Sequence, residues 1–247
     1  MRKSIVKVKP VEKATNRRQF LKLGGMGVVG AGLLVACSND DNGMGMMPDP
    51  DPNPNPAIFD LGQGDLGVLN YAYALEQLEA DFYTKVVNSF YANISDEEMQ
   101  VLTDLYYHEV NHRDFFKTAI TAAVDGNTDL VLPTLEFDYG DLDFNNREQV
   151  LTTASVLEDT GVAAYNGAGR LISNPGYLLL AGKIVSVEAR HASAIRTLLN
   201  PGSADFAGDD YVTTDTGLAA ALDPSVVLSA VGDTGFIQTS FTANNLP

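Results

Sequence analysis

The chain of 247 residues contains a single cysteine, Cys37, and only three histidines. One cysteine excludes an intramolecular disulfide and every metal site that needs several thiolates. Basic residues are also scarce, with 16 against 32 acidic residues and a formal net charge of −16. A nucleic-acid partner is therefore not expected, because phosphate binding requires a basic surface. No nucleophile elbow, phosphate-binding glycine loop or dinucleotide fingerprint is present.

The few basic residues are concentrated at the start of the chain. Residues 1–36 contain eight Lys or Arg and one acidic residue, a net charge of +7, and residues 37–247 contain 8 basic and 31 acidic residues, a net charge of −23. Arg17 and Arg18 precede an uncharged, glycine-rich stretch that ends at Cys37, which is typical of a signal peptide. The segment from Arg17 to Lys22 resembles the twin-arginine export signal of bacteria, with Asn16 where Ser or Thr is usual.

The four residues that end at Cys37 resemble a lipobox, in which the cysteine is lipidated and becomes the mature N-terminus. We therefore expect an exported protein that is anchored to a membrane of the cell envelope, on its periplasmic or outer face, through a lipid on Cys37. A transmembrane anchor is the alternative, but residues 23–36 contain five glycines and are shorter than the roughly 20 residues that span a bilayer.

The composition divides the chain into four parts. Residues 1–36 are expected to be a signal peptide. Residues 37–57, in which proline alternates with Asp and Asn, are expected to be an extended tether. Residues 58–203 hold the helical patterns, and residues 204–247 form an irregular extension rich in Gly, Asp and Thr, with one short helix expected after Pro224.

Apolar residues recur at helical spacing in four segments, and this periodicity predicts an all-α four-helix bundle. About four residues separate the first two segments and the last two, which predicts two antiparallel hairpins. Roughly 22 residues separate the second segment from the third, long enough for one crossover along the bundle. The segments are residues 65–90, 96–123, 146–172 and 177–199.

Each predicted apolar face contains one glutamate, and two of these faces also carry a histidine three residues later. A buried, unpaired carboxylate costs several kcal/mol, so four such groups in one core require cations to neutralise them. Four carboxylates and two imidazoles suit two iron ions, or alternatively two manganese ions, with positions left for oxygen or peroxide. The expected metal ligands are Glu76, Glu109, His112, Glu158, Glu188 and His191.

Over residues 60–200 this pattern resembles the ferritin-like superfamily, which places one glutamate on each of two helices and Glu-x-x-His on each of the other two. The resemblance implies that Glu109 and Glu188 bridge the metals as the catalytic carboxylates, and that Glu76 and Glu158 are terminal ligands. It also implies oxidation of Fe(II) or reduction of oxygen or peroxide. The run Leu75–Tyr83, the export signal and the long tail look like the branch that includes plant desiccation-related proteins.

Several alternatives remain open at this point. Glu79 lies one turn from Glu76, but outside the apolar face, so Glu76 is the preferred ligand. Tyr83 and Tyr165 each follow a ligand glutamate by seven residues, and are either hydrogen-bond partners of the ligands, or electron relays, or core aromatic residues.

His108-Glu109-x-x-His112 also matches the helix of zinc metallopeptidases, in which both histidines bind zinc. The metallopeptidase interpretation leaves the other glutamates unexplained. If it is wrong, His108 is expected to be a partly exposed residue or a hydrogen-bond partner of a metal ligand. A bundle that binds no metal, and acts as an envelope or stress scaffold, is the non-enzymatic alternative. Both a monomer and a dimer are compatible with this sequence.

Overall fold

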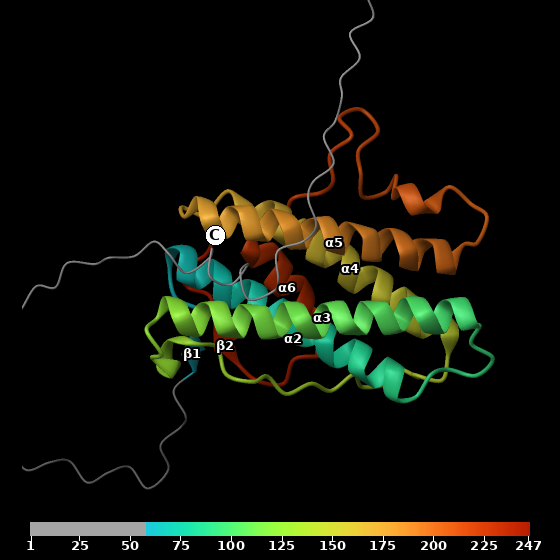
Figure 1. Cartoon of the computed structure of the whole chain (residues 1–247), viewed down its shortest axis with the longest axis horizontal. Helices are drawn as coiled ribbons and strands as arrows, with labels where there is room; N and C mark the ends of the chain where they lie inside the picture. The colour runs from blue at the N-terminus through green and yellow to red at the C-terminus, as the bar shows by residue number, and fades with distance from the viewer. Residues whose placement is uncertain (1–57) are drawn as a thin grey trace, which may run out of the picture. The chain divides into compact units, whose positions relative to one another are not determined.

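The computed structural model describes residues 58–247, which form the four-helix bundle expected from the sequence (Figure 1). Helices α2 and α3 make one antiparallel hairpin, and α4 and α5 make the other. The predicted all-α four-helix bundle with two antiparallel hairpins is thereby confirmed. The predictions for Arg17, Arg18, Cys37 and the tether lie outside the described residues. The helices are α2 (Gly64–Asn88), α3 (Asp96–Ala123), α4 (Arg147–Gly169) and α5 (Pro175–Leu199).

Polar side chains cap three of the four helices at their N-termini. Ser95 and Glu98 form a reciprocal capping box at the start of α3, which satisfies two otherwise unpaired backbone donors. The Asn146 side chain accepts a hydrogen bond from the backbone N–H of Gln149 at the start of α4. Asn174 and Pro175 together start α5 two residues earlier than the periodicity predicted, because proline suits the first helical position.

The connection between α3 and α4 runs along α2 and is held there by two buried amides. Asn70 donates to the carbonyl of Leu130 at 3.0 Å and accepts from the backbone N–H of Leu132 at 2.9 Å. Two helical turns further along α2, the side-chain oxygen of Gln77 accepts a hydrogen bond from the backbone N–H of Leu135 at 2.9 Å. The predicted crossover therefore has a fixed path, and it includes the short helix η1 (Thr128–Leu130).

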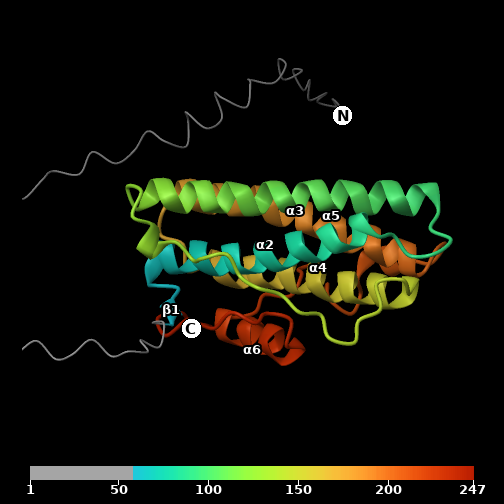
Figure 2. The ribbon, with the colours of Figure 1, turned by 90° about the horizontal axis from the view of Figure 1, so that it is seen from below.

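The first part of the C-terminal extension packs against α5, and its later part, with α6, lies on the side of α2 and α4 that faces away from α3, as Figure 2 shows. The backbone N–H of Leu222 donates to the carbonyl of Ala163 on α4 at 3.0 Å. This crossing requires a glycine at position 167, since a Cβ there would lie 1.7 Å from the Leu222 carbonyl oxygen. The extension contains η2 (Asp205–Ala207), α6 (Pro224–Thr234) and β2 (Phe241–Thr242), which pairs in parallel with β1 (Phe59–Asp60).

The crossover and the extension cover α2 and α4, so these two helices are buried along most of their length. Helices α3 and α5 keep an exposed outer face. Among residues 58–247, no helix is long and apolar enough to cross a bilayer. The bundle interior is therefore more thickly covered on the side of α2 and α4 than on the side of α3 and α5.

Candidate metal centre

The six predicted ligand residues meet at the centre of the bundle. Glu76 is on α2, Glu109 on α3, Glu158 on α4 and Glu188 on α5, and all four are completely buried. His191 is 3% exposed. Two groups of side chains have ligand atoms that lie within 4.8 Å of one another: Glu76, Glu109, His112 and Glu188 form the first, and Glu109, Glu158, Glu188 and His191 form the second.

Glu109 and Glu188 belong to both groups and give one oxygen to each. Nδ1 of His112 lies 3.3 Å from Oε2 of Glu109 and 2.9 Å from Oε1 of Glu188. Nδ1 of His191 lies 2.8 Å from Oε1 of Glu109 and 3.3 Å from Oε2 of Glu188. The two shared carboxylates thus lie between two separate sets of donors, and Glu76 and Glu158 complete one set each.

Most inward-facing atoms of this cluster lie close together without forming hydrogen bonds. Oε2 of Glu76, Oε1 of Glu109, Oε2 of Glu158, both oxygens of Glu188 and Nδ1 of His191 are buried and have no hydrogen-bond partner. Buried polar atoms are rarely left in this state in native proteins. Atoms that converge but are not aimed at each other fit a cation between them, and carboxylate oxygen with imidazole nitrogen suits iron or manganese.

Burial and the neighbouring charges shift the pKa values of the clustered side chains. Burial raises the pKa of Glu109 to about 8, and the negative charge of Glu188 adds to this shift. Burial likewise raises the pKa of Glu158, to about 7. Burial alone would lower the pKa of His112 and of His191, but the surrounding carboxylates raise both well above the ordinary value. Despite burial, the two neighbouring imidazoles lower the pKa of Glu188 to about 2.

Two tyrosines hold the terminal glutamates from the opposite hairpin. The hydroxyl of Tyr83 on α2 donates to Oε1 of Glu158 on α4 at 2.6 Å. The hydroxyl of Tyr165 on α4 donates to Oε1 of Glu76 on α2. In each glutamate one oxygen accepts a hydrogen bond from a tyrosine, and the other faces the cluster without a hydrogen-bond partner. Of the alternatives open for these tyrosines, the structure shows hydrogen bonds to the predicted ligands.

His108 lies outside both groups of possible ligands. Its Nδ1 lies 2.8 Å from Nε2 of His191, and the two rings stack with centroids 5.1 Å apart. The metallopeptidase arrangement is therefore not formed, because α3 turns Glu109 and His112 into the bundle and leaves His108 at the edge facing α5. The contact fixes the orientation of the His191 ring, whose Nδ1 points to the carboxylates, and this type of support orients metal ligands.

Glu79 is not part of either group, yet it is only 3% exposed. The geometry therefore favours Glu76 over Glu79 as the ligand. Helical periodicity did not predict that Glu79 is buried as well, because a single packed face was assumed for α2. The apolar and small residues on all faces of this helix are the signal that it is covered on several sides.

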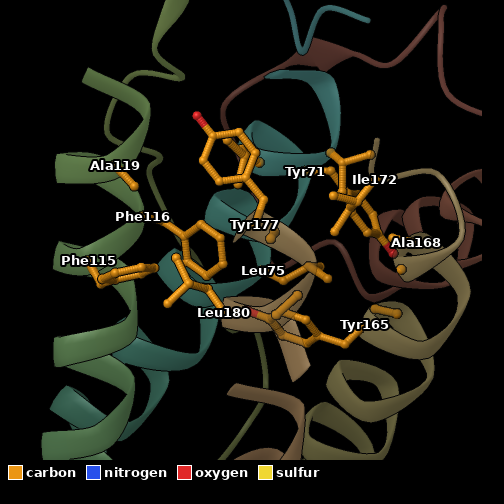
Figure 3. Close-up of a pocket in the computed structure, with 16 residues that line it drawn as sticks. Tyr71, Leu75, Phe115, Phe116, Ala119, Tyr165, Ala168, Ile172, Tyr177 and Leu180 are labelled. Carbon is orange, nitrogen blue, oxygen red and sulfur yellow. The ribbon is translucent and has the colours of Figure 1, made fainter. Parts of the chain in front are cut away.

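An apolar cavity of about 30 Å³ lies beside the centre, between all four helices (Figure 3). Tyr165 lines it and also donates the hydrogen bond to Glu76. Phe115, Ala119 and Leu180 line the side between α3 and α5, where they are partly exposed. Tyr71 is another lining residue, and its buried hydroxyl has no hydrogen-bond partner.

Comparison with protein families agrees with this geometry. Residues 64–201, more than half of the chain, match the family described as "Ferritin-like domain". A comparison with curated proteins finds no significant match. The relation to desiccation-related proteins stays a prediction from the sequence. The matched region contains all four helices and all six residues of the two groups. The chain belongs to the ferritin-like family.

Proposed function

We propose that this protein binds two iron or manganese ions in the centre of the bundle and uses them to oxidise Fe(II) or to reduce oxygen or peroxide. The observation that carries the proposal is the pair of overlapping donor groups, in which Glu109 and Glu188 each give one oxygen to either group. The buried atoms without hydrogen-bond partners support it. When bound, such a metal pair supplies redox chemistry and open positions for an oxidant.

Neighbouring side chains position the residues of this centre and exclude bulk water from it. Tyr83 and Tyr165 restrict the terminal carboxylates through hydrogen bonds across the two hairpins. His108 orients the ring of His191. The four glutamates are completely buried, and in a site without bulk water the attraction between carboxylates and cations is stronger than at the surface.

The apolar cavity suits dioxygen better than peroxide. Hydrogen peroxide forms hydrogen bonds, and moving such a molecule from water into an apolar space costs several kcal/mol when the bonds are not replaced. Dioxygen is apolar and loses no hydrogen bonds on entering. A volume of about 30 Å³ exceeds the roughly 10–15 Å³ needed for one water molecule, which is enough for a diatomic molecule.

Location at the cell envelope is the part of the proposal that depends on the sequence alone. The twin-arginine pattern at Arg17 and Arg18 and the lipobox at Cys37 support export and a lipid anchor, and twin-arginine export carries folded proteins. A protein loaded with metal before export is consistent with such a route. Palmitate labelling of wild-type protein and of Cys37→Ala in cells would test the anchor, and equal labelling of both would contradict it.

The metal content of the purified full chain tests the proposed centre. We expect two iron or manganese ions per chain after expression with both metals supplied. Glu109→Ala removes an oxygen from both groups and should abolish binding of both ions. Glu148→Gln, an exposed position at the start of α4, is the control and should keep both. One zinc ion per chain, or no metal in a well-folded protein, would contradict the proposal.

A further inference from the structure

A second cavity opens on the other side of the bundle, between α2, α4 and α6. Its volume is about 50 Å³. Val156, Ala230 and Thr234 line it and are exposed, so they form its outer rim. Leu75, Leu78 and Glu79 are buried and form its inner end. The cavity therefore leads from the surface to a buried carboxylate, and its outer wall is the C-terminal helix α6.

Glu79 has no partner that accounts for its burial. Within residues 58–247 no hydrogen bond or ion pair joins its carboxylate to another residue, although it is only 3% exposed. Gly161 on α4 leaves room for it, since a Cβ at that position would lie 3.1 Å from Oε1 of Glu79. An unpaired buried carboxylate costs several kcal/mol, so its presence at the end of an open cavity points to a positively charged ligand.

The metal centre lies directly behind this carboxylate. Glu79 follows Glu76 by one helical turn on α2, and residues at this spacing are neighbours on the helix surface. Burial raises the pKa of Glu79 well above its ordinary value, and the charge of Glu158 is the strongest contribution from a neighbouring side chain. Glu79 is therefore close to the terminal carboxylates of both donor groups, without belonging to either.

We propose that divalent cations reach the dinuclear centre through the cavity between α2, α4 and α6, with Glu79 as their transient ligand. This inference rests on the proposed function, because it needs a centre that binds metal. Glu79 is the only carboxylate that lines the cavity, and the hydroxyl groups of Thr160 and Thr234 are the other polar side chains there. Because so few ligands are present, a cation should bind there only weakly. Weak binding suits a cation that moves on to the centre, rather than one that stays in the cavity.

The proposal assigns a role to the C-terminal extension. Helix α6 supplies Ala230, Val231 and Thr234 to the cavity wall, and the hydrogen bond from Leu222 to Ala163 fixes the extension on α4. Without α6, the cavity that leads to Glu79 would lack its outer wall. The extension thus makes a defined passage out of what would otherwise be an exposed face of the bundle.

The rate of metal uptake distinguishes between two roles for Glu79. A transient ligand should affect the rate alone, and a permanent ligand should affect the number of bound ions. Metal-free full-length protein is mixed rapidly with Co²⁺, and binding is followed by the visible absorption of the bound ion. Glu79→Gln keeps the shape of the side chain and replaces the carboxyl group, which can ionise and bind a cation, with a neutral amide. We expect uptake about tenfold slower than in the wild type, since a single-sign charge in a cleft raises association rates by 10 to 1,000-fold, and we expect an unchanged final stoichiometry of two ions.

Two further variants make the result specific. Gly161→Ala places a methyl group against the Glu79 carboxylate and should slow uptake in the same direction, with a helical circular dichroism spectrum that shows an intact fold. Glu148→Gln removes a charge from an exposed position of α4 and should load at the wild-type rate. Uptake by Glu79→Gln at the wild-type rate would overturn the passage, and the dinuclear centre would still stand.

Loss of one ion in Glu79→Gln would make Glu79 a permanent ligand and would also overturn the transient role. Failure of the wild-type protein to bind two Co²⁺ ions would instead contradict the proposed function, and with it this inference. The final stoichiometry therefore tests the centre, and the rate tests the passage.

Discussion

Tyr83 of the first hairpin donates a 2.6 Å hydrogen bond to Glu158 of the second, and Tyr165 of the second hairpin donates one to Glu76 of the first. Each tyrosine follows the glutamate of its own helix by seven residues, but contacts the glutamate of the other helix. The two hairpins are thus joined at the centre by a reciprocal pair of buried contacts. The same Glu-to-Tyr spacing in both hairpins therefore gives each donor group one glutamate that is held by a tyrosine.

Tyr83→Phe should weaken the centre without dismantling it. The substitution leaves Oε1 of Glu158 buried without a donor, which costs about 1–3 kcal/mol of stability, and the loss of such a support typically lowers metal affinity by about 10–100-fold. Thermal unfolding and metal competition against a chelator measure the two effects. Tyr165→Phe should behave alike, and unchanged affinity in both variants would contradict the role given to the tyrosines.

Metal binding should release protons in a pH-dependent number. At pH 6 the imidazoles of His112 and His191 and the carboxyls of Glu109 and Glu158 are all protonated in the metal-free protein, since the pKa of each lies above 6. Metal ligands must be deprotonated, so about four protons per chain should leave on loading.

At pH 9 only the two imidazoles still carry a proton to lose, because the pKa of Glu109 is about 8 and that of Glu158 about 7. About two protons per chain should then be released. Titration calorimetry in buffers of different ionisation enthalpy counts the protons at each pH. The same count at pH 6 and pH 9 would contradict the assigned pKa shifts.

The metal-free protein should lose stability as the pH rises from about 5 to 9. Folding raises the pKa of Glu109 to about 8 and of Glu158 to about 7, from 4.5. In this window the native state holds protons that the unfolded state has lost. Stability then falls with pH, by about 1.4 kcal/mol per pH unit for each retained proton. The two histidines act in the same direction above pH 6.5.

Glu188 behaves in the opposite way, because its pKa is lowered from 4.5 to about 2. Its contribution to stability is present above pH 4.5 and is lost as the pH falls toward 2. Urea unfolding between pH 3 and 9 should therefore show a maximum near pH 5 for the metal-free protein. Metal should remove most of the decline above pH 5, and a metal-free stability that increases up to pH 9 would refute the explanation.

The sequence was sufficient to predict the helices, the crossover and the residues that meet at the centre. Helical periodicity located Glu109 and His112 on one face of their helix. The second Glu-x-x-His pattern identified Glu188 and His191 as the residues expected to face them. Periodicity could not predict the burial of Glu79, which depends on α6 packing over α2 and α4. It also could not show that the ring of His108 contacts His191, because that contact joins residues 83 positions apart.

Filling the apolar cavity should slow the reaction with dioxygen and leave metal binding intact. Ala119 is partly exposed at the edge of the cavity on α3, so Ala119→Leu narrows the access at little structural cost. Stopped-flow oxidation of the Fe(II)-loaded protein by dioxygen should become slower, by about tenfold if the added side chain raises the barrier by about 1.4 kcal/mol.

Ala122→Leu, at an exposed position of the same helix, is the matched control and should react at the wild-type rate. Oxidation by hydrogen peroxide provides a second comparison, since we expect the polar oxidant not to use this route. Equal slowing of both oxidants by Ala119→Leu would show that the cavity is not a selective path for dioxygen.

The central claim is that two metal ions lie between Glu109 and Glu188, and anomalous diffraction from iron- or manganese-loaded crystals tests it most directly. The account predicts two peaks about 3.5–4 Å apart, each next to one oxygen of Glu109 and one oxygen of Glu188, with His112 beside one peak and His191 beside the other. A single peak between His108 and His112, or no peak within the bundle, would contradict the account.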